Sequence, residues 1–176
     1  MYRQDTSVQR YRAGNVDKII VSIASGAWDE LEKLVFHENE FGDEGMMALS
    51  RAITSGSLRD LDKLCFNYNT IGDKGMKAFS EAIASGALVN LNILSFFENQ
   101  IGNEGMMAFS EAIANGALGS LNLLNLKKNQ IGDDGMRAFL TAIARGGLPN
   151  LSILYINNPS YELSAHCESK KISLSR

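Results

Sequence analysis

The sequence has little of what marks secreted or membrane-spanning proteins. Its 176 residues contain only two cysteines, Cys65 and Cys167, which are too few and too far apart for a disulfide framework. No apolar run approaches the ~18 residues of a spanning helix, and the opening segment lacks the apolar stretch of a secretory signal. We therefore expect a soluble protein of the cytoplasm or another reducing intracellular compartment, without membrane insertion.

The sequence also lacks a strong excess of charge of one sign. Twenty acidic and 17 basic residues give a net charge of -3, which provides no general attraction to nucleic acid or to an anionic membrane. A nucleic-acid partner is therefore not expected. With 45% hydrophobic and 21% charged residues, the composition is ordinary for one soluble globular domain.

Residues that would support catalysis or metal binding are also scarce. The two histidines, His37 and His166, do not share metal-ligand spacing with the cysteines. His37 and Cys65 would face the same side of adjacent strands, but without an orienting acid we interpret them as a surface imidazole beside a surface thiol. The segment 42–45 lacks the lysine of a phosphate-binding loop. We predict no enzyme activity, no catalytic residue, no metal and no cofactor.

What the chain does contain is a repeat of thirty residues. Asparagine recurs in one column of the repeat and glycine recurs three places later, at Asn39, Asn69, Asn99 and Asn129 and at Gly42, Gly72, Gly102 and Gly132. Self-similarity at this period is typical of a stacked repeat protein.

The repeat divides the chain into three parts. Residues 1–15 form an N-terminal arm or cap, and residues 157–176 form a C-terminal cap or a flexible tail. Between them, 16–156 is the array: a partial repeat 16–30, full repeats 31–60, 61–90, 91–120 and 121–150, and a final strand 151–156. A lid on the open end of the core would use Tyr161, Leu163, Ile172 and Leu174. A fragment of a longer array also fits this pattern.

Each unit is predicted to be a strand followed by a helix. Leu121 to Leu126 alternates apolar and polar residues, as a strand with one buried face does. The asparagine column would hydrogen-bond the turns of adjacent coils. Aspartate after Gly132 would be the N-cap of its own helix, an interpretation we prefer to a calcium site or a catalytic carboxylate pair. The helix face would be Met136, Phe139, Ala142 and Ile143, with Gly146 ending the helix.

The two halves of a unit have similar lengths. A helix of about twelve residues spans ~18 Å, and a strand of about six spans ~20 Å. Since strands stack more closely than helices, the array must curve with a parallel sheet on its concave side.

These residues resemble the leucine-rich repeat family. Leu91, Leu94, Phe96, Asn99 and Ile101 are spaced like its strand-and-turn signature. The long period and the helix sequence look like the ribonuclease-inhibitor-like subclass, whose members are usually intracellular. The resemblance covers roughly residues 16 to 156 and implies an α/β solenoid, a horseshoe with strands inside and helices outside. The pattern is broken at Pro159, which stands in the asparagine column and is predicted to end the array.

The surface that the fold leaves free is the outward side of the concave strands. Alternation places a varied, partly apolar set of side chains there, and contiguous exposed apolar surface often marks a partner site. We predict that the partner-binding residues are Tyr68, Ile93, Ser95, Phe97, Glu98, Leu123, Asn125, Lys127, Lys128, Ile153 and Tyr155.

The resemblance leaves function open, because the family includes inhibitors, scaffolds, immune sensors and GTPase-activating proteins. Our leading hypothesis is a non-catalytic interaction module that binds a protein or peptide on its concave face, with Tyr68, Ile93, Phe97 and Tyr155 as anchors and Lys127 and Lys128 for steering. The alternative is a structural accessory subunit of a larger assembly. Stimulation of a small GTPase is a third possibility.

Overall fold

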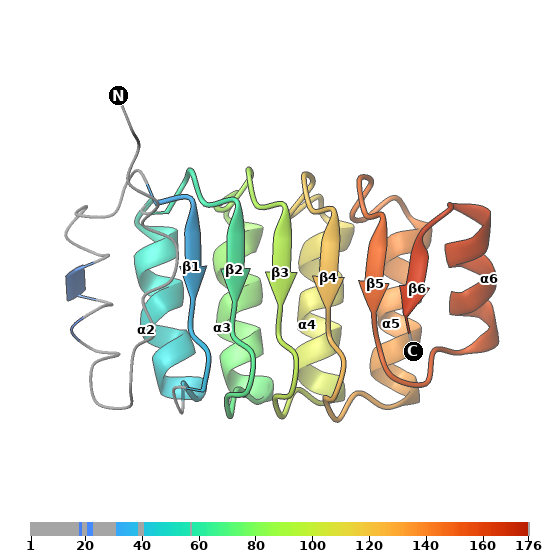
Figure 1. Cartoon of the computed structure of the whole chain (residues 1–176), viewed down its shortest axis with the longest axis horizontal. Coiled ribbons are helices and arrows are strands. Elements are labelled where there is room, and N and C mark those ends of the chain that lie inside the picture. The colour runs from blue at the N-terminus through green and yellow to red at the C-terminus, as the bar shows by residue number, and fades with distance from the viewer. Residues whose placement is uncertain (1–17, 19–20, 23–30, 39–40, 57, 176) are drawn as a thin grey trace.

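The computed structural model describes residues 18, 21–22, 31–38, 41–56 and 58–175. Strands and helices alternate along this part of the chain, as Figure 1 shows. The predicted arm 1–15 and most of the predicted partial repeat 16–30 lie outside the described residues. In chain order the elements are β1 (Lys33–Val35), α2 (Asp43–Thr54), β2 (Lys63–Cys65), α3 (Asp73–Ala84), β3 (Ile93–Ser95), α4 (Asn103–Ala114), β4 (Leu123–Asn125), α5 (Asp133–Ala144), β5 (Ile153–Tyr155), α6 (Tyr161–Ser169) and β6 (Ser173–Ser175).

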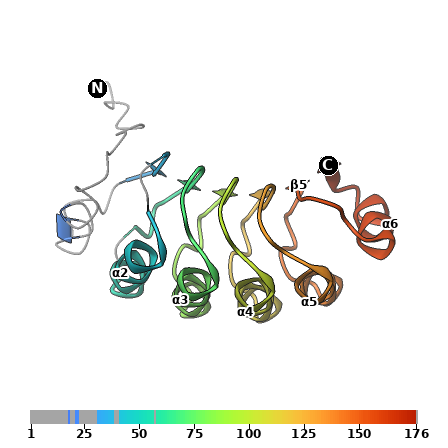
Figure 2. The ribbon, with the colours of Figure 1, turned by 90° about the horizontal axis from the view of Figure 1, so that it is seen from below.

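The strands form one parallel sheet in the order β1 to β6. From β1 to β5 each residue pairs with the residue thirty places later, so Leu34, Leu64, Leu94, Leu124 and Leu154 lie in one row. Seen along the strands, the sheet lies on the inner side of the curve and the helices on the outer side (Figure 2). The predicted solenoid with a concave parallel sheet is confirmed.

The strands are shorter than the predicted six residues, since each has only three. The reason is a turn that follows directly after each strand. Tyr68 there has a φ of 57°, and Glu38, Glu98, Lys128 and Asn158 in the same column also have positive φ. A left-handed residue breaks the extended conformation, so the alternation of side chains stops two residues after the strand.

The core is built from columns of identical or similar side chains. Phe36, Phe66 and Phe96 stack in register, with ring centroids 5.5 and 5.2 Å apart. On the helix side, a second buried column consists of Met46, Met76, Met106 and Met136. Gly86 ends α3 with a φ of 86°, and Gly56, Gly116 and Gly146 have positive φ at the same place in their units.

The asparagine column acts as predicted, as a ladder between coils. Asn99 is buried, and its Nδ2 donates to the carbonyl oxygens of Phe66 in the previous coil, at 2.7 Å, and Phe96 in its own coil, at 3.1 Å. Its Oδ1 accepts from the Ile71 amide at 3.0 Å. Asn69 and Asn129 make the same set of bonds; Asn39 lies outside the described residues.

The predicted role of the aspartates as N-caps of their own helices is wrong. The N-cap residues are Gly42, Gly72, Gly102 and Gly132, and none of them makes a side-chain capping bond. Instead, Asp43 Oδ1 accepts from the amides of Gly72 at 2.7 Å and Gly75 at 2.9 Å, so it caps the helix of the next coil. Asp43 is the first residue of α2, and its carboxylate points toward the free amides at the start of α3 rather than toward those at the start of α2.

The chain after Pro159 folds onto the last coil. Ser160 caps α6 by accepting from the Leu163 amide, and β6 then pairs with β5, with Ser173 opposite Ile153. The segment after Pro159 thus adds one shortened coil that departs from the thirty-residue register, since Ser173 lies twenty places after Ile153. Leu163 is buried, Ile172 and Leu174 pack against the core, and Tyr161 is 85% exposed and takes no part in the lid.

Candidate functional site

The concave face presents two rows of side chains that run across the strands. The first row consists of the side chains of the first residue in each strand from β1 to β5: Lys33, Lys63, Ile93, Leu123 and Ile153. The second row comes from the third residue, Val35, Cys65, Ser95, Asn125 and Tyr155. Residues within a row are direct neighbours on adjacent strands, ~4.8 Å apart along the sheet.

The middle of the second row is covered by its neighbours. Cys65 is 6% exposed and Ser95 is 5% exposed. Burial raises the pKa of the Cys65 thiol, with a smaller opposing effect of the Lys63 charge. The expectation of a surface thiol at Cys65 is therefore wrong: a small side chain on a concave sheet is closed over by larger ones on either side.

Ser95 supports the turn that follows the strands. Its hydroxyl donates to Asn67 Oδ1 at 2.6 Å, and the Phe97 amide donates to the same oxygen at 3.3 Å. This bond holds the turn after β2 against the turn after β3. Ser95 was predicted to contact a partner, but its burial leaves it little surface for one.

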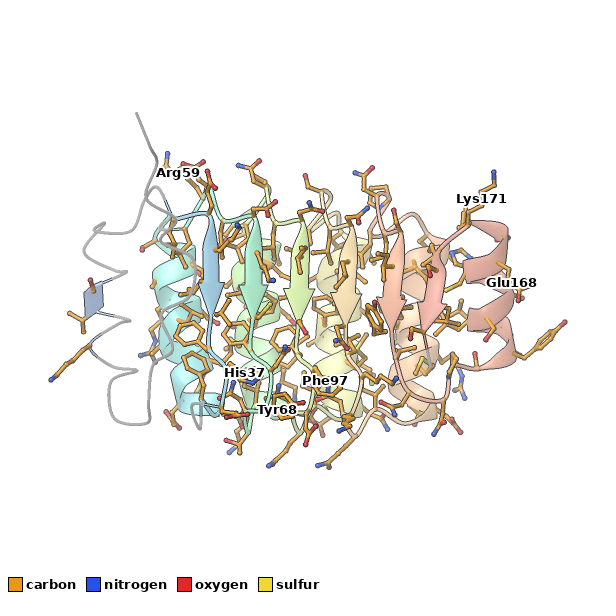
Figure 3. The ribbon with its side chains drawn as sticks, in the orientation of Figure 1. His37, Arg59, Tyr68, Phe97, Glu168 and Lys171 are labelled. Atoms are coloured by element: carbon orange, nitrogen blue, oxygen red, sulfur yellow. The ribbon has the colours of Figure 1, made fainter. Side chains whose placement is uncertain are left out.

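Beyond the second row lies an aromatic cluster, which we define as His37, Tyr68 and Phe97. Figure 3 shows the three side chains together below the ends of β1, β2 and β3. The Tyr68 ring stands edge-on to His37, with centroids 4.8 Å apart, and edge-on to Phe97, with centroids 5.2 Å apart. Edge-to-face pairs at these distances fix ring orientation. Tyr68 is still 40% exposed, so its ring is both held and accessible.

Lys128 closes the cluster on the side of β4. Its Nζ lies 5.0 Å from the centroid of the Phe97 ring and 2.7 Å from Glu98 Oε2. The hydrogen bond to Glu98 raises the pKa of Lys128. The structure thus brings together four of the predicted partner-binding residues, Tyr68, Phe97, Glu98 and Lys128.

The remaining predicted residues lie apart from this cluster. Ile93, Leu123 and Ile153 are half-buried in the first row, and Asn125 and Tyr155 are half-buried in the second. The predicted broad exposed apolar patch is therefore too large: close lateral packing on a concave sheet hides part of each side chain. Lys127 is also half-buried, and its amide donates to Asn125 Oδ1 at 3.0 Å.

Two features of the site were missed from the sequence. His37 joins the aromatic cluster, although it was not among the predicted partner-binding residues. Lys33 and Lys63 stand side by side in the first row. The thirty-residue register contained the signal for both, because it pairs Lys33 with Lys63 and brings position 37 beside position 67, the residue before Tyr68.

Within the described ranges, no group of three or more His, Cys, Asp or Glu side chains is placed to hold a metal ion. No helix in the same part of the chain is long and apolar enough to cross a membrane.

Comparisons with known proteins show which family the repeats match. A family model described as "Leucine Rich repeat" matches residues 31–50, 57–80, 87–110 and 120–140. Among solved structures, the chain is similar to an internalin from Listeria monocytogenes, with 18% identity and a TM-score of 0.39 over 86% of this chain and 49% of that one. The chain thus spans about half the length of that protein. The search of curated proteins gives no match.

Proposed function

Because the chain belongs to the leucine-rich repeat family, we propose that it is a non-catalytic module that binds a protein or peptide on its concave face. Repeats of this family generally mediate protein–protein interaction. The ribonuclease-inhibitor-like subclass and the reducing intracellular compartment belong to the same proposal. The free cysteines Cys65 and Cys167 fit such a compartment.

The aromatic cluster is the observation that carries the proposal. Binding hot spots are enriched in tyrosine and other large side chains that are already ordered before the partner arrives. Tyr68 meets this requirement, since its ring is 40% exposed while edge contacts with His37 and Phe97 hold it in place. A partner that covers the ring gains its apolar area at little cost in side-chain entropy.

The charged groups beside the cluster suit a role in orientation. Lys128 and Glu98 form an exposed pair at its rim, where charges affect the rate of association more than affinity. Lys127 is the next residue toward β4 and adds positive charge to this side. We assign both lysines to steering.

The test is recovery of partners by cross-linking and mass spectrometry from native extract. We expect Tyr68→Ala combined with Phe97→Ala to lose the specific partners. The matched control is Val89→Ala with Met107→Ala, which removes two exposed apolar side chains, 55% and 51% exposed, away from the cluster. Recovery that is equal for wild type and the Tyr68 and Phe97 variant would contradict the proposal.

A permanent accessory subunit with a tail that wraps its neighbours is less well supported. Leu163 of α6 and Leu174 of β6 pack on the protein's own core, so this segment is already engaged. No contact in the described part of the chain specifically favours regulation of a small GTPase. That role stays a prediction from the family resemblance.

A further inference from the structure

Lys33 and Lys63 place two positive charges next to each other on the concave face. They are direct partners in the register of β1 and β2, which lie side by side in Figure 1. Lys33 is exposed and Lys63 half-buried. In the described part of the chain, neither ammonium group forms an ion pair with an acidic side chain.

This arrangement is unfavourable for the protein alone. Like charges directly opposite each other on neighbouring strands destabilise a sheet. Asp62 precedes Lys63 in the chain but forms no ion pair with it. The chain as a whole is acidic, with a net charge of -3, so the lysine pair is a local departure from its surroundings. A carboxylate placed between the two ammonium groups would remove the repulsion.

The stretch of sheet between the lysines and the aromatic cluster carries small uncharged side chains on β2 and β3. Along β2 and β3 the second-row side chains are Cys65 and Ser95, both small and buried. Lys63 and Asn67, beside the cluster, are four residues apart, which is about 13 Å of extended chain.

We infer that the concave face binds an extended acidic peptide, with an aspartate or glutamate between Lys33 and Lys63 and an apolar side chain on the aromatic cluster. The inference rests on the proposed function and adds the chemistry and polarity of the partner. Because the two subsites are about 13 Å apart, the acidic residue and the apolar anchor should be separated by about three to five residues in the peptide. The charges of Lys33 and Lys63 supply the complementarity that selects it.

The experiment is selection of a displayed random peptide library on the full-length chain. Four proteins are compared: wild type, Lys33→Gln/Lys63→Gln, Tyr68→Ala/Phe97→Ala, and the control Lys74→Gln/Lys170→Gln, which removes the same charge from exposed sites on a helix and at a helix end. Circular dichroism melting of each variant establishes that it is folded.

We expect enriched peptides with an acidic residue at the stated distance from an aromatic or aliphatic residue. Their affinity should fall about tenfold in the Lys33 and Lys63 variant, stay unchanged in the control and weaken with added salt. Peptides that need Tyr68 and Phe97 but bind the lysine variant normally would overturn this inference and leave the proposed function standing. Peptides that bind the Tyr68→Ala/Phe97→Ala variant as tightly as wild type would contradict both this inference and the proposed function. Failure to enrich any peptide would count against a linear ligand, while the cross-linking experiment still tests the concave face.

Discussion

Asp73 caps the helix beside its own by accepting a hydrogen bond from the amide of Gly102. The distance from its Oδ1 to that nitrogen is 2.7 Å, and the same oxygen accepts from the Gly105 amide at 2.8 Å. Asn103 repeats the arrangement toward Gly132 and Gly135. Each helix start is therefore held by the preceding coil, which links capping to the stacking of repeats.

Replacement of Asp73 by alanine should destabilise the array. Two amides at the start of α4 would lose their acceptor, at a cost of about 1–2 kcal/mol. Asp73→Asn should cost less, because Asn103 shows that an amide oxygen makes the same pair of bonds. The free energy of unfolding from urea titration measures both.

Asp133 provides the control for this prediction. It holds the same place in α5, but the coil after it is the shortened one, whose helix is capped by its own Ser160. Asp133→Ala should therefore cost only a few tenths of a kcal/mol, from the helix dipole. Equal losses at Asp73 and Asp133 would show that capping across coils contributes nothing.

Gly105 is a helical glycine whose replacement by alanine should destabilise the protein. Alanine normally stabilises a helix interior by about 0.5–1 kcal/mol over glycine. At Gly105, however, a Cβ would lie 2.7 Å from Asp73 Oδ1 and 3.1 Å from the Asp73 backbone. We expect a net loss of about 1–3 kcal/mol, measured by thermal or urea unfolding.

Gly119→Ala is the companion to this measurement. A Cβ there meets nothing closer than the Gly116 carbonyl oxygen at 3.9 Å. We expect a neutral or slightly favourable change, because alanine restricts the unfolded chain. A stabilised Gly105→Ala would mean that the coils can separate locally without cost.

The ladder residue Asn99 should be among the most sensitive positions. Asn99→Ala would leave the Phe66 and Phe96 carbonyls and the Ile71 amide without a side-chain partner in a buried place, at about 2–4 kcal/mol. Asn122 serves as the control, since its side chain bonds to Ser152 in an exposed position and should cost under about 1 kcal/mol. Chemical unfolding of both variants decides the comparison.

The fold could be predicted well from the sequence because the same strand-and-helix pattern occurs in four consecutive repeats. The asparagine ladder, the glycine ends of the helices and the core columns all follow from periodicity. The capping partner of Asp73 does not follow from periodicity. The sequence has an aspartate at the helix start whether its carboxylate caps its own helix or the next one. Only the relative placement of coils distinguishes the two.

The candidate site was predictable only in part, for a different reason. Alternation along a strand tells which side chains face outward, and it accounts for Phe97. It does not account for Tyr68, which lies in the left-handed turn after β2. It does not tell how much area remains after lateral packing, which is why Ser95 and Cys65 are buried. Small side chains between larger neighbours on a curved sheet lose exposure that a flat sheet would leave them.

Cys65 should react slowly with alkylating reagents in the folded protein. Burial limits access and raises the pKa of the thiol above its ordinary value of 9.0, so less thiolate is present. Mass spectrometry of labelled peptides should show Cys65 modified far more slowly in the native state than in urea. Native labelling as fast as in urea would mean that the second row opens readily.

The same shift predicts how stability depends on pH. A raised pKa means that the folded state holds the thiol proton more tightly, so this contribution is present below pH 9 and is lost as the pH rises through the folded value. The unfolding free energy of wild type should therefore decline above pH 9 more steeply than that of Cys65→Ala. Parallel curves for the two proteins would contradict the sign of the shift.

The lysine pair predicts a conflict between stability and binding. Lys33→Glu alone would turn a like-charged pair on adjacent strands into an opposite-charged one, which should stabilise the sheet by about 0.2–1 kcal/mol. The same change removes half of the positive charge proposed to hold the acidic residue of the ligand, so affinity for a selected acidic peptide should fall. Urea unfolding measures the first effect and fluorescence anisotropy of the labelled peptide the second. A variant that gains stability and still binds as well as wild type would show that the two lysines are adjacent without serving the ligand, whereas opposite movements of the two quantities would tie the unfavourable pair to recognition.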